Sequence, residues 1–172
     1  MRKKYLTEEE SRILSEEALQ ESLIRAERRR DCCEADKKAA FSAYRKAERA
    51  LDSAFQRASK FCPHLIEIWA DFESYRGETL GKISALRRKL LETKNSDDSN
   101  HGKLGNEIGK LYSELNERYQ KVLAVCDKPE MHDYRHAKSQ YLVCKMDYEV
   151  ACRSAQAAEE NYQKALSAIK KI

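Results

Sequence analysis

Apolar and small residues recur at alternating intervals of three and four positions over much of the chain. The series nearest the amino terminus consists of Leu19, Leu23, Ala26, Arg30, Cys33, Lys37, Ala40, Tyr44, Ala47, Leu51, Ala54, Ala58 and Phe61. Only Arg30 and Lys37 interrupt it with charge. An alternation sustained over so many turns is typical of a helix that packs along one face against another helix. The pattern predicts a helix over about residues 7–62.

The series nearest the carboxyl terminus alternates large and small side chains. It consists of Tyr134, Ala137, Tyr141, Cys144, Tyr148, Ala151, Ala155, Ala158, Tyr162, Ala165, Ile169 and Ile172. One half of these positions is mostly tyrosine, and the other half is mostly alanine or cysteine. Small residues let two helices approach, while tyrosine rings fill space and keep their hydroxyls near water. We therefore expect a helix over about residues 129–172 that packs against the first.

Two shorter series lie between these long helices. They consist of Leu65, Ile68 or Trp69, Phe72, Tyr75 or Arg76, Thr79, Ile83, Leu86 and Leu90, and of Leu104, Ile108, Leu111, Leu115, Arg118 or Tyr119, Val122 and Val125. They predict helices over about residues 63–93 and 104–127. Pro63 and Pro129 mark the breaks, because proline lacks an N–H and is tolerated in a first helical turn. The polar, turn-rich stretch 94–103 predicts a loop.

The spacing of the two prolines predicts the architecture. Pro63 precedes the 94–103 loop by about as many residues as Pro129 follows it, so both arms of an antiparallel hairpin would break at the same level. We expect an all-α fold, a long antiparallel helical hairpin or coiled coil with both arms broken at the prolines. The alternative is a compact four-helix bundle in which the inner pair folds back. Residues 1–172 are expected to form a single helical domain.

A second set of apolar residues lies outside these series. It consists of Phe41, Phe55, Val143, Met146 and Val150. On a lone helical hairpin these side chains would be exposed, because a pair of helices buries little surface per residue. A second copy of the chain is the simplest cover, so we expect a homodimer. The same residues form the expected surface for a further, unidentified protein partner.

Composition excludes several classes of function. Charged residues make up 36% of the chain and aromatic residues 8%, with a net charge of +4. No stretch is long and apolar enough to span a membrane, and the charged amino terminus lacks the apolar core of a secretory signal. The six cysteines are expected to be reduced thiols, and we expect a cytoplasmic, intracellular location.

A small basic cluster suggests an alternative function. Arg87, Arg88, Lys89 and Lys103 lie on either side of the 94–103 loop. Such a patch could bind an anionic membrane surface or nucleic acid. Basic and acidic residues nearly balance along the chain, however, whereas nucleic-acid-binding proteins usually concentrate positive charge. Binding to a protein partner is therefore preferred, with anionic binding as the alternative.

The sequence offers one candidate metal site and no candidate catalytic site. Cys62, His64, His132 and His136 lie beside the two prolines, at one level of the expected hairpin, and cysteine with histidine is a ligand set for zinc. Apart from such a zinc ion, no cofactor is expected. No glycine-rich phosphate loop follows a strand, and no nucleophile and base show a recognisable spacing. We predict a non-enzymatic coiled-coil protein with a structural or adaptor role.

Overall fold

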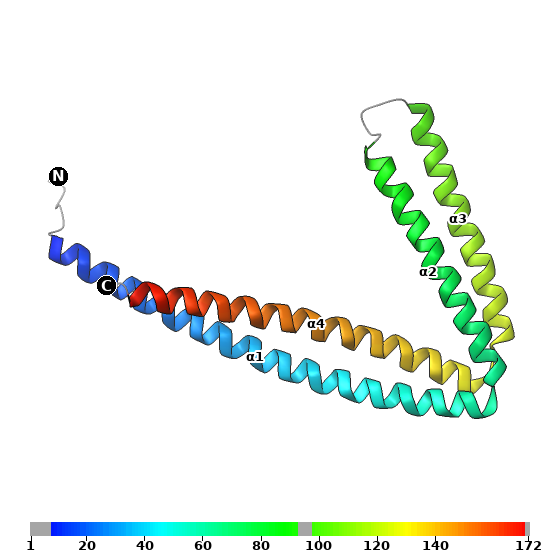
Figure 1. The fold of residues 1–172 in the computed structure, drawn as a ribbon, viewed down its shortest axis with the longest axis horizontal. Helices are drawn as coiled ribbons and strands as arrows, with labels where there is room; N and C mark the ends of the chain where they lie inside the picture. Colours follow the sequence, from blue (N-terminus) through cyan, green and yellow to red (C-terminus); the bar gives the residue numbers. More distant parts are fainter. Residues whose placement is uncertain (1–7, 93–97, 171–172) are drawn as a thin grey trace, which may run out of the picture. The chain divides into compact units, whose positions relative to one another are not determined.

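The computed structural model describes residues 8–92 and 98–170, and these ranges are helical except near the two prolines and at Lys170 (Figure 1). The helices are α1 (Glu8–Phe61), α2 (Pro63–Glu92), α3 (Asp98–Val125) and α4 (Pro129–Ile169). No strand occurs in the described ranges. The prediction of an all-α fold broken at Pro63 and Pro129 is confirmed.

Each proline occupies the first position of a new helix. The carbonyl of Cys62 accepts hydrogen bonds from the N–H groups of Leu65 (3.0 Å) and Ile66 (3.4 Å), while its own N–H donates to Ala58. The carbonyl of Lys128 likewise accepts from Met131 and His132, both at 3.0 Å. Proline is favoured at this position because the N–H that it lacks would have no partner inside the helix.

The predicted loop at 94–103 is partly wrong. Helix α3 begins at Asp98, six residues before the expected start at 104. Gly102, Gly105 and Gly109 lie within this helix, since a glycine destabilises a helix by only about 0.5–1 kcal/mol relative to alanine. The expected end positions 7, 93 and 172 lie outside the described residues.

The chain divides into two compact units. Unit 1 comprises Met1–Leu51 and Lys138–Ile172, and unit 2 comprises Asp52–Ala137. Unit 1 therefore contains most of α1 and α4. Unit 2 contains α2 and α3 together with the last turns of α1 and the first turns of α4. The expectation of one domain, and the choice between an extended hairpin and a folded-back bundle, stay predictions.

In unit 1, α1 and α4 run antiparallel along the predicted series. The ring of Tyr44 lies 5.5 Å from that of Tyr141, and the guanidinium of Arg30 lies 4.2 Å from the centre of the Tyr162 ring. From Ala26 to Leu51 the α1 residues of the series are half-buried, whereas most of their neighbours are exposed. We call this line of contacts the α1–α4 seam.

The two charged residues in the seam place their charges at its edge. Arg30 contacts Asp31 at 2.8 Å, and Lys37 contacts Glu34 at 3.2 Å. The hydrocarbon parts of long basic side chains pack well against apolar surface while their charged groups stay near solvent. Arg30 and Lys37 therefore interrupt the pattern of residue types without interrupting the packing.

The core of unit 2 begins where the ends of the four helices meet and continues along α2. Its buried hydrophobic side chains are Ala54, Ala58, Cys62, Leu65, Trp69, Phe72, Ile83, Cys126, Met131 and Tyr134. Helices α2 and α3 lie side by side (Figure 1), with the Phe72 and Tyr119 rings stacked 5.6 Å apart. Gly77 and Gly81 lie within α2 without ending it. The core thus concentrates aromatic and sulfur-containing side chains at the two breaks.

The predicted series are wrong by one residue at both breaks. Phe61 and Val125 were expected in the core, but their side chains are 61% and 56% exposed. Cys62 and Cys126, each one position later, are 6% and 0% exposed. The regular helices end at Phe61 and Val125, so the spacing that holds inside a helix no longer places the next residue.

Candidate interaction surfaces

The predicted partner-binding residues are all exposed, by 45% to 65% of their surface. Three of them share one face of α4. Val143, Met146 and Val150 are spaced by three and four residues, and at 100° per residue they point away from the seam positions Tyr141 and Tyr148. Met146 is the most exposed of the three, at 65%. We call these three residues the α4 outer stripe.

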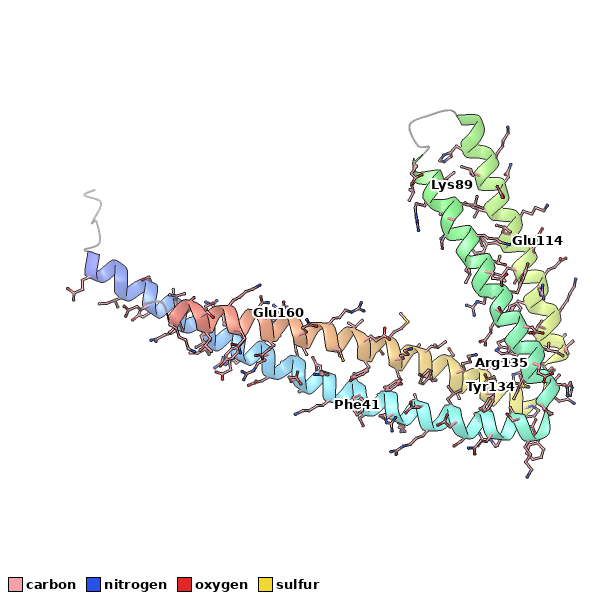
Figure 2. The ribbon with its side chains drawn as sticks, viewed as in Figure 1. Phe41, Lys89, Glu114, Tyr134, Arg135 and Glu160 are labelled. Atoms are coloured by element: carbon pink, nitrogen blue, oxygen red, sulfur yellow. The ribbon has the colours of Figure 1, made fainter. Side chains whose placement is uncertain are left out.

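The two phenylalanines differ from the outer stripe in their surroundings. Phe41, which projects from α1 (Figure 2), has its ring 5.3 Å from that of Tyr148 within unit 1. Phe55 has its ring 5.8 Å from that of Tyr134 within unit 2. Each phenylalanine covers the edge of a tyrosine and leaves nearly half of its own surface exposed. Both therefore contribute to packing inside their units, which the outer stripe does not.

The basic residues lie where the hairpin of α2 and α3 reaches the segment 93–97. Arg87, Arg88 and Lys89 are exposed in the last turns of α2, and Lys103 is exposed near the start of α3. The guanidinium of Arg87 lies 5.5 Å from the centre of the Tyr112 ring on α3. Cations and an aromatic ring therefore occur together at this end of the hairpin.

The predicted zinc site is not formed. No group of three or more His, Cys, Asp or Glu side chains could hold a metal ion in the part of the chain that the structure describes. Cys62 is buried in the core of unit 2, whereas His64, His132 and His136 are exposed. The ring of His132 instead contacts Oδ1 of Asp127 at 2.7 Å and Nη2 of Arg135 at 2.8 Å.

The reason for this correction is the direction of the first turns of α2 and α4. Met131 and Tyr134 face the core, so His132 and His136 project from the other side of α4. On α2, Leu65 and Trp69 face the core, which leaves His64 at the surface. The four predicted zinc ligands lie beside the two prolines, but their side chains do not come together.

Two tyrosines of the seam, Tyr44 and Tyr148, have raised pKa values. The hydroxyls of Tyr44 and Tyr141 lie 3.4 Å apart, and the Tyr44 hydroxyl donates to Oε1 of Glu48 at 3.4 Å. The hydrogen bond with Tyr141, burial and the charge of Glu48 raise the pKa of Tyr44 from 10.0 to about 12. A hydrogen bond with Cys152 raises the pKa of Tyr148 as well. Neither hydroxyl is activated as a base or a nucleophile.

Two exposed side chains near the basic residues were missed by sequence reasoning. Leu91 is 66% exposed and Tyr112 is 39% exposed. The signal for Leu91 was the pair Leu90–Leu91, because two adjacent helical residues cannot both face α3. The half-buried Leu90 continues the packed series, and Leu91 projects beside the cations.

Comparison with known proteins found no match for this chain. The chain matches no protein family, no curated protein and no solved structure. None of the helices within the described ranges combines the length and the apolar character needed to cross a bilayer.

Proposed function

We propose that the protein is a non-enzymatic helical coiled-coil protein that forms a homodimer and binds a protein partner in a structural or adaptor role. The observation that carries this proposal is the α4 outer stripe. Its three apolar side chains lie on the face of α4 that α1 leaves uncovered, and each exposes more than half of its surface.

The packing of unit 1 supports self-association. Among its described residues, Ala155 and Ala158 are the only hydrophobic side chains that are fully buried, at 2% and 3% exposure. Unit 2, in contrast, buries large side chains such as Trp69, Phe72 and Met131. Two helices joined mainly by half-buried residues have a thin core, and a second layer of helices would complete it. A second copy supplies that layer whenever the chain itself is present.

Burial of the α4 outer stripe would favour association. Full burial of a valine or methionine side chain contributes about 1.5–3 kcal/mol. Val143, Met146 and Val150 are already partly covered, so burying the remainder gives roughly half of that for each residue, and every residue counts twice across a two-fold axis.

Phe41 adds a flat aromatic surface within the same unit, and we propose it as a contact for the protein partner.

Sedimentation velocity of the full chain at micromolar concentration tests the self-association. We expect a dimer for the parent and a shift toward monomer for Met146→Glu, which would bury a charge in the interface. Ile24→Glu is the matched control, because Ile24 is 48% exposed on α1 of the same unit but lies outside the stripe. A monomeric parent, or an equal shift caused by Ile24→Glu, would refute the assignment of the stripe.

A further inference from the structure

One end of unit 2 combines positive charge with exposed apolar surface. In residues 86–92 of α2 and 101–112 of α3 the exposed cations are Arg87, Arg88, Lys89, Lys103 and Lys110, and the acidic residues are Glu92 and Glu107. Lys110 also contacts Glu114 on the next turn, at 4.0 Å. Over the whole stretch 86–112 the sequence has six basic and four acidic residues, so a small excess of cations remains at this end of the hairpin.

Leu91 distinguishes this surface from an ordinary solvated helix end. It is 66% exposed, more than any other large hydrophobic side chain in the described residues. It lies two residues after Lys89 on α2, whose last turns Figure 2 marks at Lys89. Tyr112 adds an aromatic ring that is 39% exposed and lies under the guanidinium of Arg87. We call this set of cations, with Leu91 and Tyr112, the hairpin-end surface.

We propose that the hairpin-end surface binds the anionic headgroups of a phospholipid bilayer and places Leu91 at the headgroup–acyl boundary. An anionic bilayer offers negative charge and hydrocarbon in one surface, and the hairpin end offers the complement of both. Tyrosine is favoured at that boundary because its ring is apolar and its hydroxyl is polar. Nucleic acid would satisfy the cations but would leave Leu91 in water.

The binding is peripheral, reversible and dependent on salt. Each basic residue near an anionic membrane strengthens binding about fivefold, and screening by salt reduces this contribution. One exposed leucine adds a modest apolar term, so neither component is sufficient alone. This inference uses residues of unit 2 only, and it does not require the self-association proposed for unit 1.

Co-sedimentation with vesicles tests the proposal on the full chain. The probe is a series of vesicles of phosphatidylcholine with phosphatidylserine, compared with vesicles of phosphatidylcholine alone. We expect binding to the anionic vesicles only, and a loss of that binding at high salt. The double variant Arg88→Glu with Lys103→Glu should weaken binding by at least about 25-fold, since two cations are removed. Leu91→Ser should weaken it about 5- to 30-fold without changing the charge, because about two thirds of the leucine surface is available for burial.

The matched control is Lys38→Glu with Lys46→Glu on α1. Both lysines are exposed, and this variant has the same total charge as the hairpin-end double variant. Circular dichroism melting of every variant confirms that the fold is retained. The proposal is overturned by an absence of binding to anionic vesicles, by equal loss in the α1 control, or by an unchanged affinity of Leu91→Ser. Binding to an oligonucleotide that depends on Arg88 and Lys103 but not on Leu91, without vesicle binding, would replace lipid with nucleic acid.

Discussion

The guanidinium of Arg135 lies over the indole ring of Trp69, with its central carbon 5.1 Å from the ring centre. Nε of the same arginine donates to the carbonyl of Met131 at 3.3 Å. Trp69 is 7% exposed, and its Nε1 has no hydrogen-bond partner among the described residues. The arginine, which lies in the second turn of α4 beside Tyr134 in Figure 2, therefore covers an aromatic core residue of unit 2.

Replacing Arg135 by Gln should destabilise unit 2. The change removes the cation–π contact, and we expect the free energy of unfolding to fall by about 1 kcal/mol. Trp69 is the only tryptophan in the chain, so its fluorescence reports directly on this site. Urea unfolding monitored by that fluorescence measures the effect. Arg76→Gln, at an exposed position of α2, is the control; equal stability of the two variants would contradict the assigned role of Arg135.

The one-residue displacement at the helix breaks predicts opposite outcomes for two truncations. Phe61→Ala should change the free energy of unfolding by less than about 0.5 kcal/mol, because the ring is mostly exposed. Met131→Ala should cost about 2–5 kcal/mol, because the side chain is fully buried and its loss leaves a cavity. Chemical denaturation of both variants decides the matter. A large cost for Phe61→Ala would restore the original prediction that Phe61 belongs to the core.

The tyrosine pair of the seam should make stability depend on alkaline pH. The pKa of Tyr44 is about 12 in the folded chain, against 10.0 for an unperturbed tyrosine, so folding favours the neutral phenol. Its contribution to stability is complete below pH 10 and is lost as the pH rises toward 12. Thermal melting of the parent and of Tyr44→Phe over this range should converge as the pH increases. Parallel melting curves would show that the Tyr44–Tyr141 contact does not stabilise the fold.

The six cysteines should differ widely in reactivity. Cys32 is exposed, whereas Cys62 and Cys126 are buried. Burial also raises the pKa of the Cys126 thiol, which lowers the fraction of reactive thiolate at neutral pH. Timed alkylation followed by peptide mass spectrometry should find Cys32 modified early and Cys126 modified only when unit 2 unfolds. Alkylation of both at similar rates in the native protein would contradict the buried position of Cys126.

Heptad spacing was a reliable guide inside the helices. It located the seam residues from Ala26 to Leu51 and the first positions of α2 and α4, because proline and the 3-4 pattern act through local geometry. It failed at Phe61 and Val125, because the regular repeat of about 3.6 residues per turn stops where a helix ends. Residue type did not resolve the choice, because cysteine is found fully buried at least as often as phenylalanine or valine.

The outer stripe and the basic cluster could be predicted from the sequence more reliably than the zinc site. Exposure of Val143, Met146 and Val150 followed from their position opposite the seam, and the cations followed from composition. The zinc site was predicted from the shared level of its four residues along the hairpin. The periodicity that places Leu65 and Tyr134 in the core also places His64, His132 and His136 on outer faces of their helices, so the facing of each helix argued against the site.

The contact between Phe55 and Tyr134 has a consequence for the order of folding. It joins the two ends of unit 2, the segment Asp52–Ala137, which is continuous in sequence. Closing a flexible loop of that length costs on the order of 4 kcal/mol in chain entropy. Once unit 2 has formed, that cost is already met, and the remaining parts of α1 and α4 start from adjacent points. We therefore expect unit 2 to fold first and the α1–α4 seam to form afterwards, turn by turn. A substitution that destabilises unit 2 would then slow the formation of seam turns that it does not contact.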